Sequence, residues 1–232
     1  MRKKHSRRFN KAQAMVDSSK VYELSDAVRL LKTLPAVRFT ESVEIAVRLG
    51  IDPKKTDQLV RGSVSLPKGT GKSVRIAVFA EGDKAKEAEA AGADIVGSQD
   101  LADKIQGGFD DFDMTIAAPD MMKHVGKLGR VLGPSGKMPS PKAGTVTPNI
   151  ADAVREFKAG KIEFRTDAGA NVHAAIGQSS FDADDLVANI SAFVAHIRAL
   201  KPAQAKGAFI RRVCVSTSMG PGLQIAVVEE EE

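Results

Sequence analysis

Four basic side chains lie in one stretch that is rich in glycine and proline and free of acids, and such a set is able to bind phosphate. The stretch, which we call the glycine loop, runs from Gly126 to Thr145. Its basic residues are Lys127, Arg130, Lys137 and Lys142. Three prolines remove backbone donors and fix φ, so the stretch cannot continue as a helix or central strand beyond its first turn or two. A cationic, irregular loop is expected to contact a partner, and its charge favours phosphate.

Two glycine–lysine tracts resemble the phosphate-binding loop of nucleotide-hydrolysing enzymes only in part. In Lys68-Gly-Thr-Gly-Lys-Ser73, the position that requires glycine is occupied by Leu66. The pair Gly136-Lys137 fails at the same spacing, and neither tract joins a strand to a helix in the required order. An enzyme that binds phosphate or a nucleotide on this part of the chain remains an alternative, although no catalytic group supports it.

No set of residues has the spacing of a catalytic or metal site. The four histidines are scattered, and none has a nucleophile and an acid at motif spacing. Phe109 to Asp113 lacks the alternating ligands of a calcium loop, so we expect an acidic turn there. Cys214 is the one cysteine, which excludes an intramolecular disulfide, and we expect a small buried strand residue. We therefore expect no enzyme activity, no cofactor and no metal.

Charge is distributed unevenly along the 232 residues, whose formal net charge is +5. Residues 68–159 carry thirteen basic and thirteen acidic side chains, so the two flanks carry the whole excess. Basic flanks favour a nucleic-acid partner, although a merely soluble basic surface would have the same composition. Residues 81–120 carry eleven acids, so one surface of the middle segment should repel nucleic acid.

Composition also bounds the class of protein. Hydrophobic residues make up 43% of the chain, which is enough for packed cores. No apolar run approaches the roughly 18 to 20 residues that span a membrane, and no apolar segment follows the basic start. We therefore expect no membrane span, no secretory signal and a cytoplasmic location.

Both flanks show the spacing of half-exposed strands and amphipathic helices. The first ten residues are basic, and we expect them to be mobile until bound. In the first flank we expect a helix over Val21–Leu34 with Ser25 as N-cap, then strands at Phe39–Leu49 and Gln58–Leu66. In the last flank we expect a hairpin around Asp167–Ala170, a helix over Asp182–Leu200, and strands at Ala208–Ser216 and Leu223–Val228.

The middle segment has a different pattern, in which short apolar strands alternate with short helices. We expect strands at Val74–Phe79, Ile95–Val96 and Met114–Ala118, and helices at Lys84–Ala91, Leu101–Ile105 and Ala151–Lys158. This pattern is typical of a parallel sheet covered on both faces. We therefore expect an α/β protein with an α+β domain from residues 1–67 and 160–232 and an inserted domain from 68–159. Two adjacent connections predict a hinge between them.

Polar side chains on the flank strands form a second candidate site. Ser42 and Glu44 alternate outward on one strand, and Lys161 and Arg165 do so on another. A third strand ends in Ser216-Thr-Ser-Met-Gly-Pro221. Short hydroxyls, an unbranched methionine and backbone amides suit close approach to an RNA backbone and its ribose hydroxyls. An ordinary solvated sheet face with a hairpin turn would show the same pattern.

These motifs resemble the bacterial large-subunit ribosomal protein L-one family, the proteins of the mobile stalk beside the tRNA exit site. The similarity covers nearly the whole chain. It rests on the glycine loop and on Phe39-Thr-Glu-Ser-Val-Glu44, Leu49-Gly-Ile-Asp-Pro53, Val60-Arg-Gly-Ser-Val-Ser-Leu-Pro67, Glu89-Ala-Ala-Gly-Ala-Asp94, Lys158-Ala-Gly-Lys-Ile-Glu-Phe-Arg165 and Thr217-Ser-Met-Gly-Pro221.

The resemblance implies a discontinuous split β-α-β domain and an inserted Rossmann-like, three-layer domain. It also implies that the first domain binds large-subunit ribosomal RNA. The matching positions are Phe39, Ser42, Glu44, Lys161, Arg165, Thr217, Ser218, Met219 and Gly220. Lys127, Arg130, Lys137 and Lys142 then become a secondary contact to tRNA or distal stalk RNA. Ser42 and Ser218 stand where threonine is common in the family, which keeps the hydroxyl and loses a methyl contact.

The resemblance implies further partners, namely exit-site tRNA, other ribosome components and the messenger RNA of the protein's own operon. Family members assist release of deacylated tRNA, and they repress that operon by binding a messenger site that mimics the ribosomal one. The run Glu229–Glu232 is not part of the family pattern, and we expect a frayed tail. A general translational or chaperone-like module is a third possibility, and it predicts RNA binding without sequence preference.

Overall fold

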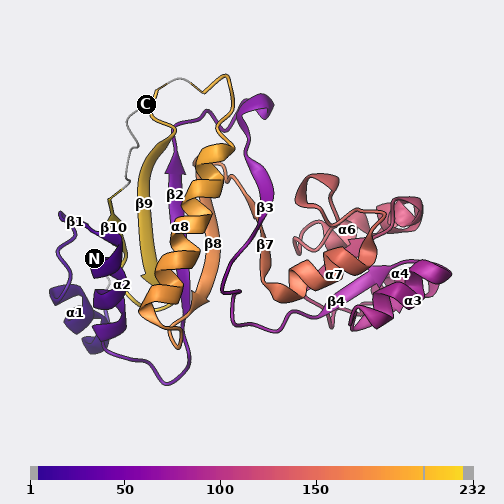
Figure 1. The fold of residues 1–232 in the computed structure, drawn as a ribbon, viewed down its shortest axis with the longest axis horizontal. Helices are drawn as coiled ribbons and strands as arrows, with labels where there is room; N and C mark the ends of the chain where they lie inside the picture. The colour runs from indigo at the N-terminus through magenta and orange to yellow at the C-terminus, as the bar shows by residue number, and fades with distance from the viewer. Residues whose placement is uncertain (1–4, 206, 227–232) are drawn as a thin grey trace. The chain divides into compact units, whose positions relative to one another are not determined.

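The computed structural model describes residues 5–205 and 207–226, and the chain divides into two compact units (Figure 1). The first unit comprises residues 1–71 and 164–232, and the second comprises residues 72–163. The chain passes between the units at two points, and each lies four residues beyond the boundary expected from the sequence. At the first crossing, Lys68 donates its backbone N–H to Asn189 Oδ1 (3.0 Å), and Gly71 accepts a hydrogen bond from Gln178 Nε2 (2.8 Å). These bonds fasten residues 68–71 to the first unit.

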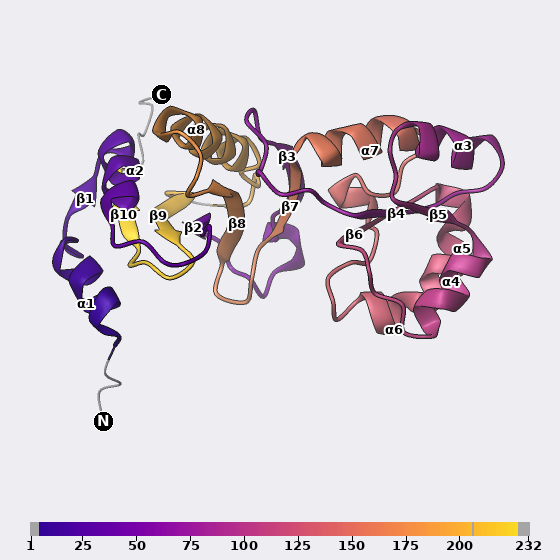
Figure 2. The ribbon, with the colours of Figure 1, turned by 90° about the horizontal axis from the view of Figure 1, so that it is seen from below.

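The first unit is built on a five-stranded sheet with strand order β1-β10-β9-β2-β8. Its strands are β1 (Val21–Tyr22), β2 (Ser42–Leu49), β8 (Asn171–Gln178), β9 (Ile210–Thr217) and β10 (Leu223–Ile225). Helices α2 (Leu24–Thr33) and α8 (Ala183–Ala199) pack against each other on one side of the sheet (Figure 2). No helix among the described residues covers the other side of β2 and β8. A separate two-stranded sheet pairs β3 (Arg61–Ser65) with β7 (Lys161–Arg165).

Strand β2 alternates as its sequence predicts. Val43, Ile45, Val47 and Leu49 are at most 1% exposed, whereas Glu44 and Arg48 are exposed. The pattern follows from the pleat, which sends successive side chains to opposite faces of a sheet with one covered side. The polar face of β2 is therefore the open one.

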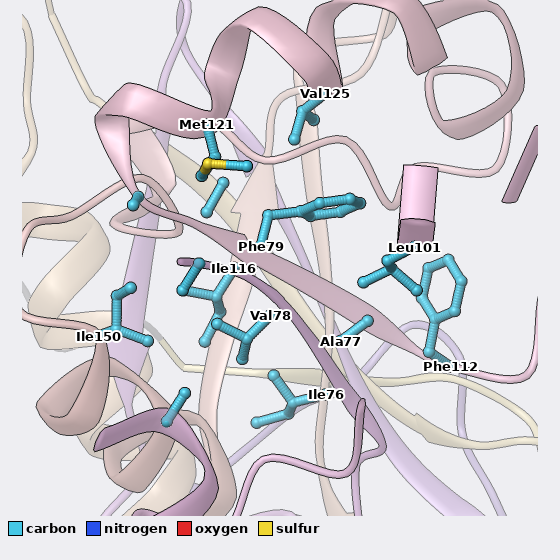
Figure 3. Packing of buried hydrophobic residues seen from close by; sticks show 14 of the residues in the cluster. Ile76, Ala77, Val78, Phe79, Leu101, Phe112, Ile116, Met121, Val125 and Ile150 are labelled. Carbon is cyan, nitrogen blue, oxygen red and sulfur yellow. The ribbon is translucent and has the colours of Figure 1, made fainter. Parts of the chain in front are cut away.

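The second unit contains a parallel sheet with strand order β5-β4-β6. Its strands are β4 (Ile76–Phe79), β5 (Ile95–Gly97) and β6 (Met114–Ala117). In Figure 2, α3 (Asp83–Ala90) and α7 (Ile150–Ala159) lie on one side of this sheet, and α4 (Gln99–Gln106) and α5 (Met122–Val125) lie on the other. All four residues of β4 are buried, and Phe79 packs in the core with Ile116 and Met121 (Figure 3). The expected parallel sheet with two covered faces is confirmed.

The glycine loop is helical only at its beginning, as its prolines require. A 3-10 turn, η3 (Gly126–Leu128), leads into α6 (Gly129–Leu132). The remainder is irregular apart from the 3-10 turn η4 (Pro141–Ala143). Two short turns complete the described elements, η1 (Thr56–Gln58) before β3 and η2 (Pro119–Met121) before α5.

Helix α1 (Arg7–Ala14) was not expected from the sequence, and its Ser6 cap accepts a hydrogen bond from the Phe9 N–H (3.2 Å). Two expectations for the first flank are wrong. The second helix does not start at Val21, because residues 21–22 pair with β10 as a parallel strand. That pairing satisfies backbone groups that a helix would otherwise use, so tertiary contacts override local propensity. Glu23, and not Ser25, is the N-cap.

Two further expectations concern membrane-spanning helices and the acidic run near the C-terminus. None of the helices within the described ranges is long and apolar enough to cross a membrane. The run Glu229–Glu232 lies outside the described residues.

Candidate nucleic-acid interface

The start of β2 and the end of β9 lie side by side in the sheet. Their register pairs Val43 with Thr217. Beyond the ladder, Ser218 donates its backbone N–H to the Ser42 carbonyl (3.1 Å), and its Oγ accepts the Ser42 N–H (3.1 Å). The strand pair therefore brings together most of the residues expected to bind RNA. We call this group the turn site, and it comprises Phe39, Ser42, Glu44, Thr217, Ser218, Met219 and Gly220.

The backbone of the turn is held at several successive points. Gly220 donates its N–H to the Thr217 carbonyl (3.1 Å). The Met219 N–H donates to Glu41 Oε1 (2.8 Å), and the Met219 carbonyl accepts from Arg8 Nη2 (2.6 Å). Because these backbone groups already have partners, the turn offers a ligand mainly its side chains.

Two large apolar side chains are exposed at the turn site. Phe39 is 57% exposed and Met219 is 51% exposed. Glu44 is also exposed and has no partner among the described residues. Apolar side chains of this kind pack on bases and sugars, and a carboxylate accepts hydrogen bonds from ribose hydroxyls or base amino groups. The arrangement suits close contact with nucleotides more than simple attraction to phosphate.

Gly220 is at a position where a side chain does not fit. A Cβ there would lie 2.4 Å from Thr217 Oγ1 and 3.6 Å from Leu34. Thr217 is only 8% exposed, so its side chain has little room to move away. Glycine is therefore needed for the close approach of the turn to its own first residue.

Arg165 and Lys161 do not join the turn site. Thr166, beside Arg165, bridges Val172, which pairs with Val47 near the other end of β2. That position is about 17 Å along the strand from Ser42. Lys161 belongs to the second unit, where its Nζ lies 2.7 Å from Glu156 Oε2 and 5.3 Å from the centre of the Phe157 ring. Its charge is used inside the protein.

The four cations of the glycine loop differ in what they contact. Lys127, Arg130 and Lys142 are exposed and have no partner within the described part of the chain. Lys137 is 18% exposed at its side chain, and its Nζ lies 2.6 Å from Asp110 Oδ1 and 4.8 Å from the centre of the Phe112 ring. Three of the four expected contacts are thus open to a ligand, whereas Lys137 fastens the loop to a neighbouring turn.

Other motifs of the sequence have structural partners. Residues 68–71 connect the two units and do not join a strand to a helix, so they are not a phosphate-binding loop. In the acidic turn, Asp111 pairs with Arg75, and Asp113 accepts the Arg75 N–H (2.9 Å). Burial raises the pKa of the half-buried Cys214 thiol, which keeps it protonated and unreactive.

Sequence reasoning missed Glu41 and Arg8, the two residues that hold the Met219 peptide. Glu41 had a signal, because the alternation of β2 extends back to it and places a carboxylate on the inward side. A buried carboxylate needs hydrogen-bond donors, and here one of them is the Met219 N–H. Arg8 had no such signal, since it lies 211 residues from its partner.

Comparison with known proteins gives a consistent result. Residues 30–221 match the model of the ribosomal protein L1p/L10e family. The chain is 51% identical over 222 residues to large ribosomal subunit protein uL1 of Corynebacterium glutamicum, covering 96% of this chain and 94% of that protein. It is 50% identical to the protein of the same name from Kosmotoga olearia, with 96% of each chain covered. It is 52% identical to that of Alkalilimnicola ehrlichii, with 93% and 94% covered.

The family model matches most of the chain, and the relatives are about half identical to it. Together these findings establish the protein family. The expected resemblance is confirmed, and with it the expectation of a non-enzymatic protein. The chain belongs to the ribosomal protein L1p/L10e family, whose members are structural, RNA-binding constituents of the ribosome in the cytoplasm.

Proposed function

We propose that the protein binds large-subunit ribosomal RNA at the mobile stalk through the turn site. The observation that supports this most directly is the exposure of two apolar side chains, Phe39 on the segment that leads into β2 and Met219 on a turn whose backbone is already hydrogen-bonded. A rigid turn loses little conformational entropy on binding, so its side chains can recognise the shape of the RNA. The relatives named above are proteins of the large ribosomal subunit, which agrees with this assignment.

Filter binding with a large-subunit RNA fragment that contains the stalk tests this proposal. Phe39→Ala and Met219→Ala in the full chain should each weaken binding, and unrelated RNA of equal length should compete poorly. The matched control is Leu59→Ala, which removes an apolar side chain that is 44% exposed elsewhere in the same unit. Equal affinity of all three variants and the unaltered protein would refute the assignment of the turn site. Equal competition by unrelated RNA would instead favour a general interaction module.

We also propose that the protein assists release of deacylated tRNA from the exit site, with the second unit as the moving part. Two chain segments join the units, which is the connectivity of a hinge. The exposed cations Lys127, Arg130 and Lys142 supply a surface on which tRNA phosphates can be held. Ribosomes carrying the triple alanine variant should release exit-site tRNA at a changed rate, measured with labelled tRNA. An unchanged rate contradicts this role and leaves the ribosomal RNA assignment intact.

Finally, we propose that the turn site binds the messenger RNA of the protein's own operon and represses its translation. One binding surface would then serve two RNAs, so the two should compete. Adding the stalk RNA fragment to a translation reaction programmed with that messenger should relieve repression, and Met219→Ala should weaken repression as it weakens binding of the stalk RNA fragment. Repression that persists in the variant while ribosomal RNA binding is lost would show that the two RNAs use different sites.

A further inference from the structure

We infer that Arg8 and Glu41 form a clamp on the backbone of Met219, on both sides of its Cα, and are positioning residues for RNA recognition. The inference rests on the proposed role of the turn site. Glu41 Oε1 accepts a hydrogen bond from the Met219 N–H (2.8 Å), and Arg8 Nη2 donates one to the Met219 carbonyl (2.6 Å). The N–H and the carbonyl of Met219, which belong to the peptide groups before and after its Cα, are thus each held by a charged side chain. Hydrogen bonds to charged groups are stronger than those between neutral groups. The Met219 side chain therefore projects from a backbone that is held in one conformation.

Each half of the clamp is itself anchored. Glu41 is 7% exposed, its N–H donates to Ser179 Oγ (3.1 Å), and its carbonyl accepts the Ser179 N–H (2.8 Å). The second guanidinium nitrogen of Arg8, Nη1, donates to the Pro35 carbonyl (3.2 Å). Arg8 therefore ties the turn to the segment that follows α2 and leads to Phe39. The same guanidinium thus bonds the backbone of Met219 and that of Pro35, four residues before Phe39.

Helix α1 is stabilised in part by the contact between Arg8 and Met219. Isolated helices of eight residues do not persist in water, so α1 depends on its tertiary contacts. Those contacts include Ala12, which is fully buried, and Arg8. The N-terminal helix and the turn thus stabilise each other, although they are more than 200 residues apart in sequence.

The clamp also determines which groups of Met219 are open to an RNA ligand. With its N–H occupied and its carbonyl already accepting one hydrogen bond, Met219 presents chiefly its side chain, so an RNA ligand is selected mainly by fit to that side chain. Removal of Glu41 or Arg8 takes away one of the hydrogen bonds that hold the peptide groups before and after the Met219 Cα, so the turn becomes less rigid. The turn would then populate several conformations, and binding would select one of them at a cost in affinity.

The test compares Arg8→Ala with Arg7→Ala, its exposed neighbour on α1, in the full chain. Arg8→Ala should weaken binding of the stalk RNA fragment about tenfold, and Arg7→Ala should not. The dependence of log affinity on log salt should keep its slope in Arg8→Ala, because a positioning residue neutralises no phosphate. A slope reduced by about 0.7–0.9 would mean that Arg8 contacts phosphate directly, which overturns the clamp.

Two conservative variants separate geometry from charge. Arg8→Lys keeps the charge and has one nitrogen for two carbonyls, so it should bind as weakly as Arg8→Ala. Glu41→Gln keeps an oxygen acceptor for the Met219 N–H and should bind nearly as well as the unaltered protein. A rescue of binding by Arg8→Lys would contradict the clamp.

A measurement without RNA keeps the inference testable apart from the proposed function. By NMR hydrogen exchange, the amides of Met219 and Gly220 should exchange about tenfold faster in Arg8→Ala, with the β2 amides unchanged. Unchanged exchange at the turn overturns the clamp. If Met219→Ala and Gly220→Ala bind RNA normally, the turn site is wrong and the role of the clamp in recognition falls with it. If those two lose affinity while Arg8→Ala does not, only the clamp is wrong.

Discussion

The turn site of the first unit and the glycine loop of the second unit both expose side chains to solvent, yet they are built for different kinds of contact. The turn site carries no basic residue among its seven members, and its backbone is hydrogen-bonded to β2 and to the Thr217 carbonyl. The glycine loop carries three exposed cations without partners in the described part of the chain. The turn site therefore has a backbone held in one conformation, and the glycine loop has positive charges that a ligand can contact.

This difference separates affinity that depends on fit from affinity that depends on salt. Contacts to bases and sugars require a prearranged surface, and they change little with ionic strength. Contacts to phosphate release counterions, so they weaken steeply as salt rises and carry little sequence information. We therefore expect changes at the turn site to alter specific binding, and changes at the glycine loop to alter its salt dependence.

The largest effect should come from Gly220→Ala. The new Cβ would lie 2.4 Å from Thr217 Oγ1, so the turn must shift. We expect affinity for the stalk RNA fragment to fall roughly 100-fold, because overpacking of this kind costs about 1–3 kcal/mol and here it displaces the binding side chains. Filter binding measures the change, and circular dichroism checks the fold.

Gly222→Ala is the matched control, since a Cβ at Gly222 has nothing within 4 Å. It should bind as the unaltered protein does. Equal losses of affinity in the two variants would mean that the sequence of the turn matters and its close packing does not. The turn site would then not act through a fixed shape.

A smaller effect is expected for Met219→Ala. This change removes an exposed side chain that contacts RNA in the proposed complex, so it should cost about 1–2 kcal/mol of binding, or roughly tenfold, without loss of stability. Val131→Ala removes a comparable apolar side chain, 45% exposed, from the glycine loop and should leave stalk RNA affinity unchanged. If Val131→Ala had the larger effect, the glycine loop would be the primary site.

Two parts of the turn site were predictable from the sequence because they depend on short-range patterns, whereas the pairing of Ser42 with Ser218, 176 residues apart, was not. Alternation in β2 predicted which side chains face outward, and a serine–methionine–glycine turn after a strand predicted a tight connection. Similarly, the fully apolar run of β4 predicted a strand covered on both faces. In each case the information lies within about ten residues.

The parts that sequence reasoning missed depend on contacts between distant residues. Lys137 looks like a free cation in sequence, but Asp110, 27 residues away, neutralises it in the structure. Helix α1 has a composition that suggests mobility, yet Arg8 fixes it to Met219. Val21 has helical spacing, but its pairing with β10 makes it a strand. No local pattern contains these partners.

Among the glycine loop cations, the triple variant Lys127→Ala, Arg130→Ala, Lys142→Ala should have a modest effect. The slope of log affinity against log salt for tRNA should fall by about 0.7–0.9 for each phosphate contact that is lost. Specific binding of the stalk RNA fragment at physiological salt should change less than about threefold. A loss as large as that of Gly220→Ala would place the main binding energy in the second unit and reverse the comparison.

The smallest effect on RNA is expected from Lys137→Ala, although it also removes a cation from the glycine loop. Lys137 is bound to Asp110 and lies over Phe112, so it is expected to contribute to the stability of the second unit and not to RNA binding. We expect the free energy of unfolding to fall by about 1 kcal/mol, since the ion pair is partly exposed and the ring contact is weak. Thermal unfolding measures this change, with Lys142→Ala as the control that should leave stability unaltered. If Lys137→Ala instead lowered the salt slope for tRNA as much as Lys142→Ala does, the ion pair would open on binding, and all four cations of the loop would act together.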